Sequence, residues 1–134
     1  MKPSLTLAEA RQIIAAARAE AEKNQWSVSI AVVDDSGNLL ALERADGAFP
    51  HSVELAMGKA WTAAVVRNTT KALEDMVKER PGLLSFPGHV RVQGGLPIKS
   101  GADFVGGVGV SGAASHQDEQ CAHAGLAAID LKKA

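Results

Sequence analysis

The sequence is poor in cysteine, in aromatic residues and in net charge. It has one cysteine and no tyrosine, and aromatic residues make up 4% of its 134 positions. A single cysteine excludes an intramolecular disulfide. Lysine and arginine number 14 against 15 acidic residues, a formal net charge of −1. The basic surface that nucleic-acid binding requires is therefore missing, and we expect no nucleic-acid partner.

Long apolar runs are missing as well. No stretch approaches the ~20 apolar residues of a membrane-spanning helix, and the first residues lack the apolar core of a signal peptide. We therefore expect a cytoplasmic protein that does not associate with membranes. This length predicts one domain over residues 1–134. Because the apolar residues are mostly small, we expect leftover apolar surface and a homo-oligomer, a dimer or higher.

Local patterns predict an alternation of helices and short strands. Thr6-Leu7-Ala8-Glu9 forms a capping box, which begins a helix that ends near Asn24. Alternating apolar residues from Val28, followed by a turn at Asp35–Gly37, predict a β-hairpin. Two more helices are predicted at 50–67 and 71–80, and a final helix begins at an S-x-x-D cap formed by Ser115 and Asp118. The whole pattern predicts an α+β fold with an antiparallel sheet of about five short strands.

The stretch from Arg91 to Gly112 carries seven of the 13 glycines among strand-forming valines. One interpretation is a glycine-rich hairpin that packs closely under a helix. The other is a backbone that must come near a ligand, since both uses favour positions without a side chain. Within it, Gly107 to Gly112 spells G-x-G-x-x-G, but only a helix follows, so we reject a dinucleotide site.

Lysine, histidine and cysteine side chains are the candidates for chemistry. Lys59 lies between alanines of the second predicted helix, where it either extends its amine to solvent or pairs with an anionic ligand group. Cys121 lies on an apolar stripe and is expected to be a small buried residue. His116 and His123 are seven residues apart, roughly 10 Å along a helix, so they do not bind one metal ion together. The histidines are His51, His89, His116 and His123.

Five short motifs follow one another along nearly the whole chain. They are Val33-Asp34-Asp35-Ser36-Gly37, Lys59-Ala60-Trp61-Thr62-Ala63, Gly94-Gly95-Leu96-Pro97-Ile98, Val108-Gly109-Val110-Ser111-Gly112, and the segment from Asp118 to Gly125. In this order they resemble the GlcG/HbpS-like family of haem-degrading proteins, which is related to the C-terminal domain of PduO-type proteins. The resemblance implies a profilin-like fold, with a five-stranded antiparallel sheet flanked by helices on both faces, and assembly into homo-oligomers.

The resemblance also implies a function. Members of the family bind haem or related tetrapyrroles, and one branch is described as haem-degrading. The alternative is a binding or enzymatic accessory of small hydroxy- or keto-acid catabolism, of the glycolate or diol type, that uses the same crevice without iron. A structural oligomer is the third possibility. Whether the protein is an enzyme is left open.

The site that the resemblance implies is a crevice between the Lys59 helix, a loop at 94–98 and the start of the last helix. Backbone amides and nearby cations there suit a carboxylate or a haem propionate. A histidine at its edge would bind the haem iron axially, and His51 and His116 are the candidates. The ligand-binding residues expected in the crevice are Lys59, Arg91, Gly94, Gly95, Pro97 and Ser115.

Overall fold

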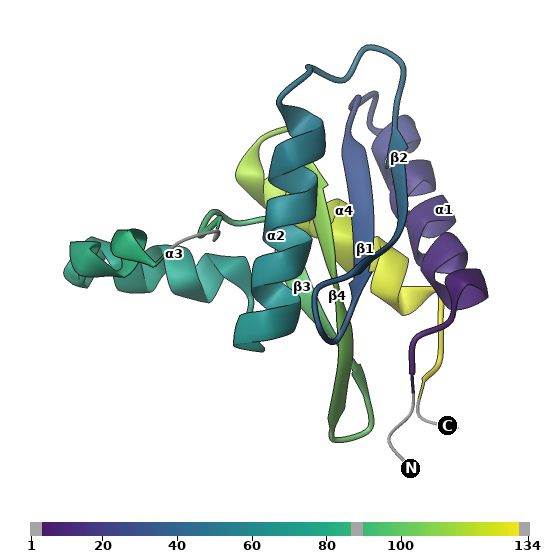
Figure 1. The fold of residues 1–134 in the computed structure, drawn as a ribbon. Coiled ribbons are helices and arrows are strands. Elements are labelled where there is room, and N and C mark those ends of the chain that lie inside the picture. Colours follow the sequence, from purple (N-terminus) through teal and green to yellow (C-terminus); the bar gives the residue numbers. More distant parts are fainter. Residues whose placement is uncertain (1–3, 87–89, 132–134) are drawn as a thin grey trace.

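The computed structural model describes residues 4–86 and 90–131. Figure 1 shows a sheet with helices on both sides of it and a helical arm that extends away from the body. The helices are α1 (Leu7–Lys23), α2 (Ser52–Val66), α3 (Thr70–Glu79) and α4 (Ser115–Ala127), with a 3-10 helix η1 (Pro81–Ser85). The strands are β1 (Ser29–Asp34), β2 (Leu39–Arg44), β3 (Gly95–Ser100) and β4 (Asp103–Ser111).

The sheet is antiparallel throughout, and its strand order is β2-β1-β4-β3. The expectation of five strands is wrong, because the sheet has four strands within residues 4–86 and 90–131. The segment before β3 is not a strand, since side chains bind its backbone amides. Val90 N donates to Thr62 Oγ1 at 3.0 Å, and Gln93 N donates to Glu74 Oε1 at 2.8 Å. These bonds anchor the segment to α2 and α3 instead of to a neighbouring strand.

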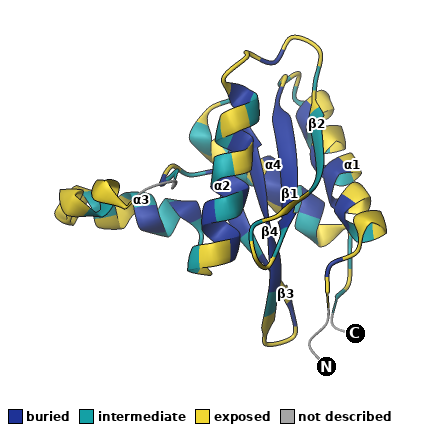
Figure 2. Cartoon of the chain, viewed as in Figure 1, coloured by how far each residue is buried: buried dark blue, intermediate teal, exposed yellow. Residues whose placement is uncertain are grey.

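Alternation along the strands separates two packed layers. Ile30 and Val32 face a core that includes Ile13 of α1 and Cys121 of α4. The intervening residues of β1 face a smaller cluster against the alanines of α2. Figure 2 shows buried residues along the strands and on the helix surfaces that contact them. Because successive strand residues point to opposite faces, one sheet supports helices on both sides.

Glycines of β4 allow α2 to lie very close to the sheet. A Cβ atom at Gly107 would overlap the carbonyl oxygen of Ala60, and one at Gly109 would overlap that of Ala56. The prediction that the glycine-rich strand packs under a helix is therefore confirmed at these two positions. The G-x-G-x-x-G spelling falls within and just after antiparallel β4, and that environment agrees with its rejection as a dinucleotide site.

Most local predictions hold, with one shift at the start of α4. Thr6 caps α1 through the expected capping box, and Asp34 accepts two backbone hydrogen bonds in its turn. Ser115 was expected to cap α4, but the N-cap residue is Ala114. Asp118 binds Ala113 N instead, so the start of the helix moves by one residue. No helix in the described ranges is long and apolar enough to cross a membrane.

Candidate functional site

A buried ion pair joins α2 to α4. Lys59 Nζ lies 3.1 Å from Asp118 Oδ2, and both side chains are 3% exposed. Lys59 also donates to the carbonyl oxygen of Val110 at 2.9 Å, while Asp118 Oδ1 accepts from Ala113 N at 3.0 Å. The pair therefore fixes the end of β4 and the first turn of α4 against the middle of α2.

Burial dominates the electrostatics of this pair. Desolvation raises the pKa of Asp118, although the charge of Lys59 and the hydrogen bond from Ala113 act in the opposite direction. Of the two interpretations of Lys59, extension of the amine to solvent is wrong, because the side chain is buried. The anion that it meets within the described residues is Asp118, a residue of the same chain.

Two glycines lie against Lys59, one against its side chain and one against its backbone. A Cβ atom at Gly94 would lie 2.9 Å from Lys59 Nζ, and Gly94 has φ +135°, a conformation that favours glycine. A Cβ atom at Gly95 would lie 2.5 Å from the carbonyl oxygen of Lys59. The structure thus brings Lys59, Gly94 and Gly95 together, as the expected crevice requires. Segment 94–98 was expected to be a loop, but residues 95–98 belong to β3, where Pro97 pairs with Gly107.

Arg91 lies in the anchored segment between η1 and β3. It is 8% exposed, and no hydrogen-bond acceptor in the described part of the chain contacts its Nε atom. The guanidinium carbon lies 5.5 Å from the centroid of the Phe86 ring, a cation–π arrangement. Among residues 4–86 and 90–131, no carboxylate forms an ion pair with Arg91. The expected crevice residue is thus a buried cation without a described counter-ion.

The candidate iron ligands lie at the starts of two helices. His51 is the N-cap residue of α2, and His116 lies in the first turn of α4 beside Ser115; both histidines are exposed. His116 is close enough to affect the pKa of Asp118. His89 lies outside the described residues. In the described part of the chain, no three His, Cys, Asp or Glu side chains cluster as a metal site. Haem iron needs only one or two protein ligands, so this leaves haem binding open.

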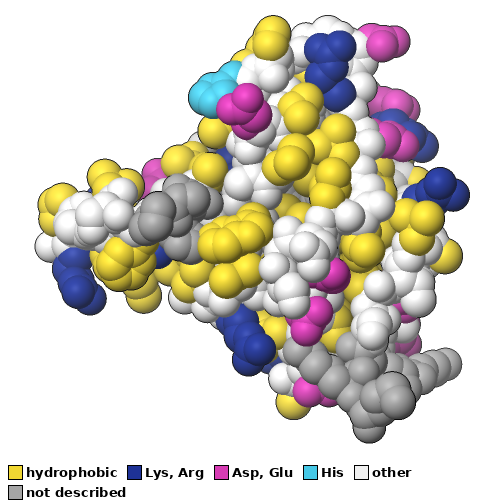
Figure 3. All heavy atoms as spheres, in the orientation of Figure 1, with side chains coloured by type: hydrophobic (Ala, Val, Ile, Leu, Met, Phe, Trp, Pro, Cys, Tyr) yellow, Lys and Arg dark blue, Asp and Glu magenta, His cyan; other side chains and the backbone are white. Residues whose placement is uncertain are grey.

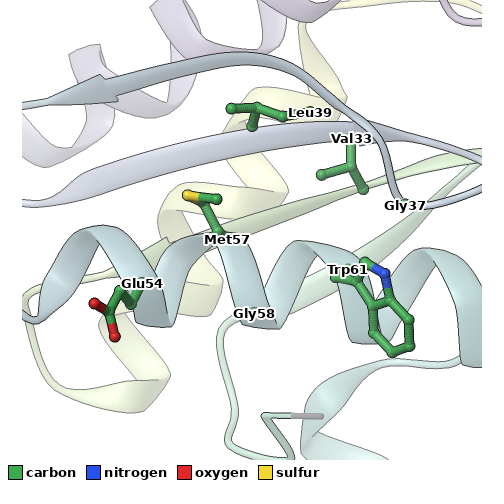
Figure 4. Close-up of a pocket in the computed structure, with 7 residues that line it drawn as sticks. All are labelled: Val33, Gly37, Leu39, Glu54, Met57, Gly58 and Trp61. Carbon is green, nitrogen blue, oxygen red and sulfur yellow. The ribbon is translucent and has the colours of Figure 1, made fainter. Parts of the chain in front are cut away.

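A hollow of about 510 Å³ lies between α2 and the β1–β2 hairpin. Figure 4 shows Met57 pointing from α2 toward Leu39, while the Glu54 carboxylate points away from them. Figure 3 shows hydrophobic side chains gathered over this face. We call this hollow the outer groove; it is lined by Val33, Gly37, Leu39, Glu54, Met57, Gly58 and Trp61.

The hairpin turn closes one end of the outer groove. Gly37 has φ +85°, and a Cβ atom there would overlap the ring of Trp61. Only glycine allows the turn to approach the indole this closely. Both residues fall in motifs on which the family resemblance rests, but neither was among the expected site residues. A turn glycine and a tryptophan on the helix that follows were the available signal.

Comparisons with known proteins agree with this fold and assign the chain to a family. A family model described as "Haem degrading protein HbpS-like" matches residues 5–127. Protein GlcG of Escherichia coli strain K12 is 44% identical over 114 residues, which cover 83% of this chain and 85% of GlcG.

Two solved structures are similar over nearly the whole chain. The crystal structure of HbpS has a TM-score of 0.92 at 41% identity and covers 96% of this chain and 92% of HbpS. The crystal structure of a PduOC:haem complex has a TM-score of 0.90 at 32% identity and covers 95% of this chain and 96% of that one. The α+β fold with an antiparallel sheet and helices is therefore shared with HbpS.

Proposed function

Because the chain belongs to the HbpS-like family of haem-degrading proteins, we propose that it binds haem or a related tetrapyrrole in the outer groove. The observation that carries this proposal is an open, apolar hollow of about 510 Å³ with a tryptophan and a methionine in its wall. This volume lies within the usual range for small-molecule sites. A relative of the same fold has been crystallised in complex with haem, which supports the same ligand here.

The residues present fit a macrocycle. Leu39 and Trp61 provide apolar surface for its faces, and the Met57 thioether lies in the groove. His51 lies one helical turn before Glu54, which lines the groove. Imidazole and thioether are both axial ligands of haem iron, and bound haem would supply an iron centre whose reactivity they tune. His116 begins a helix on the opposite face of the sheet, so we favour His51.

The proposal covers binding. The family description names haem degradation, but we assign that activity to no residue, because no described feature supplies electrons for it. The alternative function, binding of a small hydroxy- or keto-acid without iron, stays a prediction. Lys59 is already paired with Asp118, so Arg91 is the buried cation that remains for the carboxylate of such an acid.

We also propose self-association through the arm formed by α3 and η1. This arm extends from the body in Figure 1 and exposes Met76 and Leu84 at 47% and 66%. Exposed apolar clusters of this kind mark interaction sites. With a net charge of −1, two copies repel each other little.

Four expectations from the sequence stay predictions. They are the cytoplasmic location, the absence of a nucleic-acid partner, the absence of a membrane partner and a single domain over 1–134.

A haemin titration followed by absorbance tests the proposed ligand. We expect a saturable Soret shift with the unmodified protein, the same shift with His116→Ala, and a loss or change of the shift with His51→Ala. A shift lost only with His116→Ala would move the site to α4. Absence of a saturable shift with the unmodified protein would contradict haem binding.

A further inference from the structure

Beyond the outer groove, we propose that Arg91 is the anchor of a second binding site, for the carboxylate of a small organic acid. The inference starts from a missing partner. A buried charge without a counter-ion costs several kcal/mol, so buried guanidinium groups are normally paired and hydrogen-bonded. Arg91 is 8% exposed, and its Nε atom has no acceptor among residues 4–86 and 90–131.

The surrounding chain holds Arg91 in place without neutralising it. The backbone N–H of its neighbour Val90 donates a hydrogen bond to the Thr62 hydroxyl of α2. The backbone N–H of Gln93 donates one to the Glu74 carboxylate of α3. The Glu74 carboxylate thus accepts a backbone amide, and the described residues contain no ion pair between it and Arg91. The backbone on both sides of Arg91 is therefore fixed, and burial restricts its side chain. The arginine is preorganised to receive an anion, because little side-chain freedom remains to be lost on binding.

The chemistry of the site favours a carboxylate. A guanidinium offers parallel N–H groups that match the two oxygens of a carboxylate, and one cation neutralises one carboxylate charge. A phosphate dianion would need further donors. The Phe86 ring lies against the guanidinium and is 52% exposed, so it offers an apolar surface for the short carbon chain of an organic acid.

This site is separate from the outer groove, because neither Arg91 nor Phe86 lines that groove. The inference does not rest on haem binding, and either site can exist without the other. A competing explanation is that a carboxylate of a second copy of the chain pairs with Arg91. That explanation predicts that substitution of Arg91 changes the oligomeric state.

Thermal unfolding of the full chain in tris chloride tests the proposal, with acetate, lactate and pyruvate as probes and chloride at matched ionic strength as the reference. Ligand that binds only the folded state raises the Tm in a saturable way. We expect a saturable rise with at least one of the three acids. The Arg91→Met variant should weaken the apparent affinity for the acid roughly thirtyfold or more. The Arg91→Lys variant should weaken it to a smaller extent, because an ammonium lacks the parallel N–H groups of a guanidinium.

Arg67→Met is the matched control. Arg67 lies 5.4 Å from the Phe104 ring centroid in a similar ring contact, but it is exposed. It should keep the full response to the acids. Without any acid, Arg91→Met should unfold at the same Tm as the unmodified protein or higher, because it removes an unpaired buried charge.

Three results would overturn the proposal. One is the absence of a saturable response to all three acids. Another is an equal response in Arg91→Met, which would place the anion elsewhere. The third is a lower Tm or a changed oligomeric state of Arg91→Met in the absence of acid, which would assign Arg91 to structure or to a contact between copies. None of these results bears on the haemin titration.

Discussion

The Lys59 ammonium and the Asp118 carboxylate meet at 3.1 Å inside the protein, although they belong to helices on opposite faces of the sheet. The contact is possible because glycines at 94 and 109 leave space beside the Lys59 side chain. One ion pair therefore links the two layers at the end of β4.

Breaking this ion pair should destabilise the protein strongly. We expect Lys59→Met or Asp118→Leu alone to lower the free energy of unfolding by about 3–5 kcal/mol, because the remaining partner is left buried. Since burial already raises the pKa of Asp118 against the attraction of Lys59, the double variant Lys59→Met/Asp118→Leu should recover most of this loss. Urea unfolding of the four proteins measures the coupling.

The control for this cycle is the exposed pair between Lys71 and Asp75, at 2.7 Å. Lys71→Ala should cost at most about 0.5 kcal/mol, because solvent screens exposed pairs. Equal losses for Lys59→Met and Lys71→Ala would show that burial does not govern the effect.

A charge in the outer groove should weaken haemin binding. Leu39 and Leu7 are equally exposed, at 47% and 45%, but only Leu39 lines the groove. We expect Leu39→Asp to reduce haemin affinity by about tenfold or more, since a carboxylate would be desolvated against the macrocycle. Leu7→Asp should bind as the unmodified protein does. If both variants bind equally well, haemin does not occupy the groove.

The close contact of α2 with β4 predicts a large difference between two glycine-to-alanine substitutions. A Cβ atom at Gly109 would overlap the Ala56 carbonyl oxygen, whereas nothing lies within 4 Å of one at Gly82. We expect Gly109→Ala to lower the free energy of unfolding by about 1–3 kcal/mol or more, and Gly82→Ala to change it by less than about 0.5 kcal/mol. Chemical denaturation compares them; similar values would refute the close packing.

The Cys121 thiol should make stability fall at alkaline pH. It is fully buried, and burial raises its pKa from 9.0 to about 12. The folded state therefore keeps a proton that the unfolded state loses, so the stability contributed by this group is complete below pH 9 and is lost between pH 9 and 12. Denaturation at several pH values should show a steeper fall for the unmodified protein than for Cys121→Ala. Parallel curves would contradict it.

Self-association should depend on the helical arm. Leu84→Asp places a charge on its most exposed apolar residue, at 66%, and we expect it to shift the protein toward monomer. Leu7 lies at the start of α1, which packs on the face of the sheet opposite α2. The Leu7→Asp variant should therefore leave the oligomer unchanged. Light scattering after size exclusion measures both. A monomeric unmodified protein, or an unchanged Leu84→Asp oligomer, would contradict this role of the arm.

The sequence by itself determined the local structure. Local interactions define the capping box at Thr6 and the turn at Asp34, so the sequence pattern predicts both. The glycines of β4 act through a missing side chain, which the sequence also shows. The family could also be recognised from the sequence, because five motifs follow one another in the order that is typical of it. The cap at Ser115 was misplaced because Asp118 is a partner of a distant lysine as well as a capping residue.

Tertiary structure alone decided the sites. Lys59 and Asp118 are 59 positions apart, and no periodicity along a chain specifies such a partner. The position of Arg91 depends on two side chains that bind the backbone of its neighbours and attach this segment to α2 and α3. The outer groove lies between a hairpin and a helix, so its walls appear only when both have packed on the sheet. Local interactions fix elements, whereas burial and pairing depend on which elements come together.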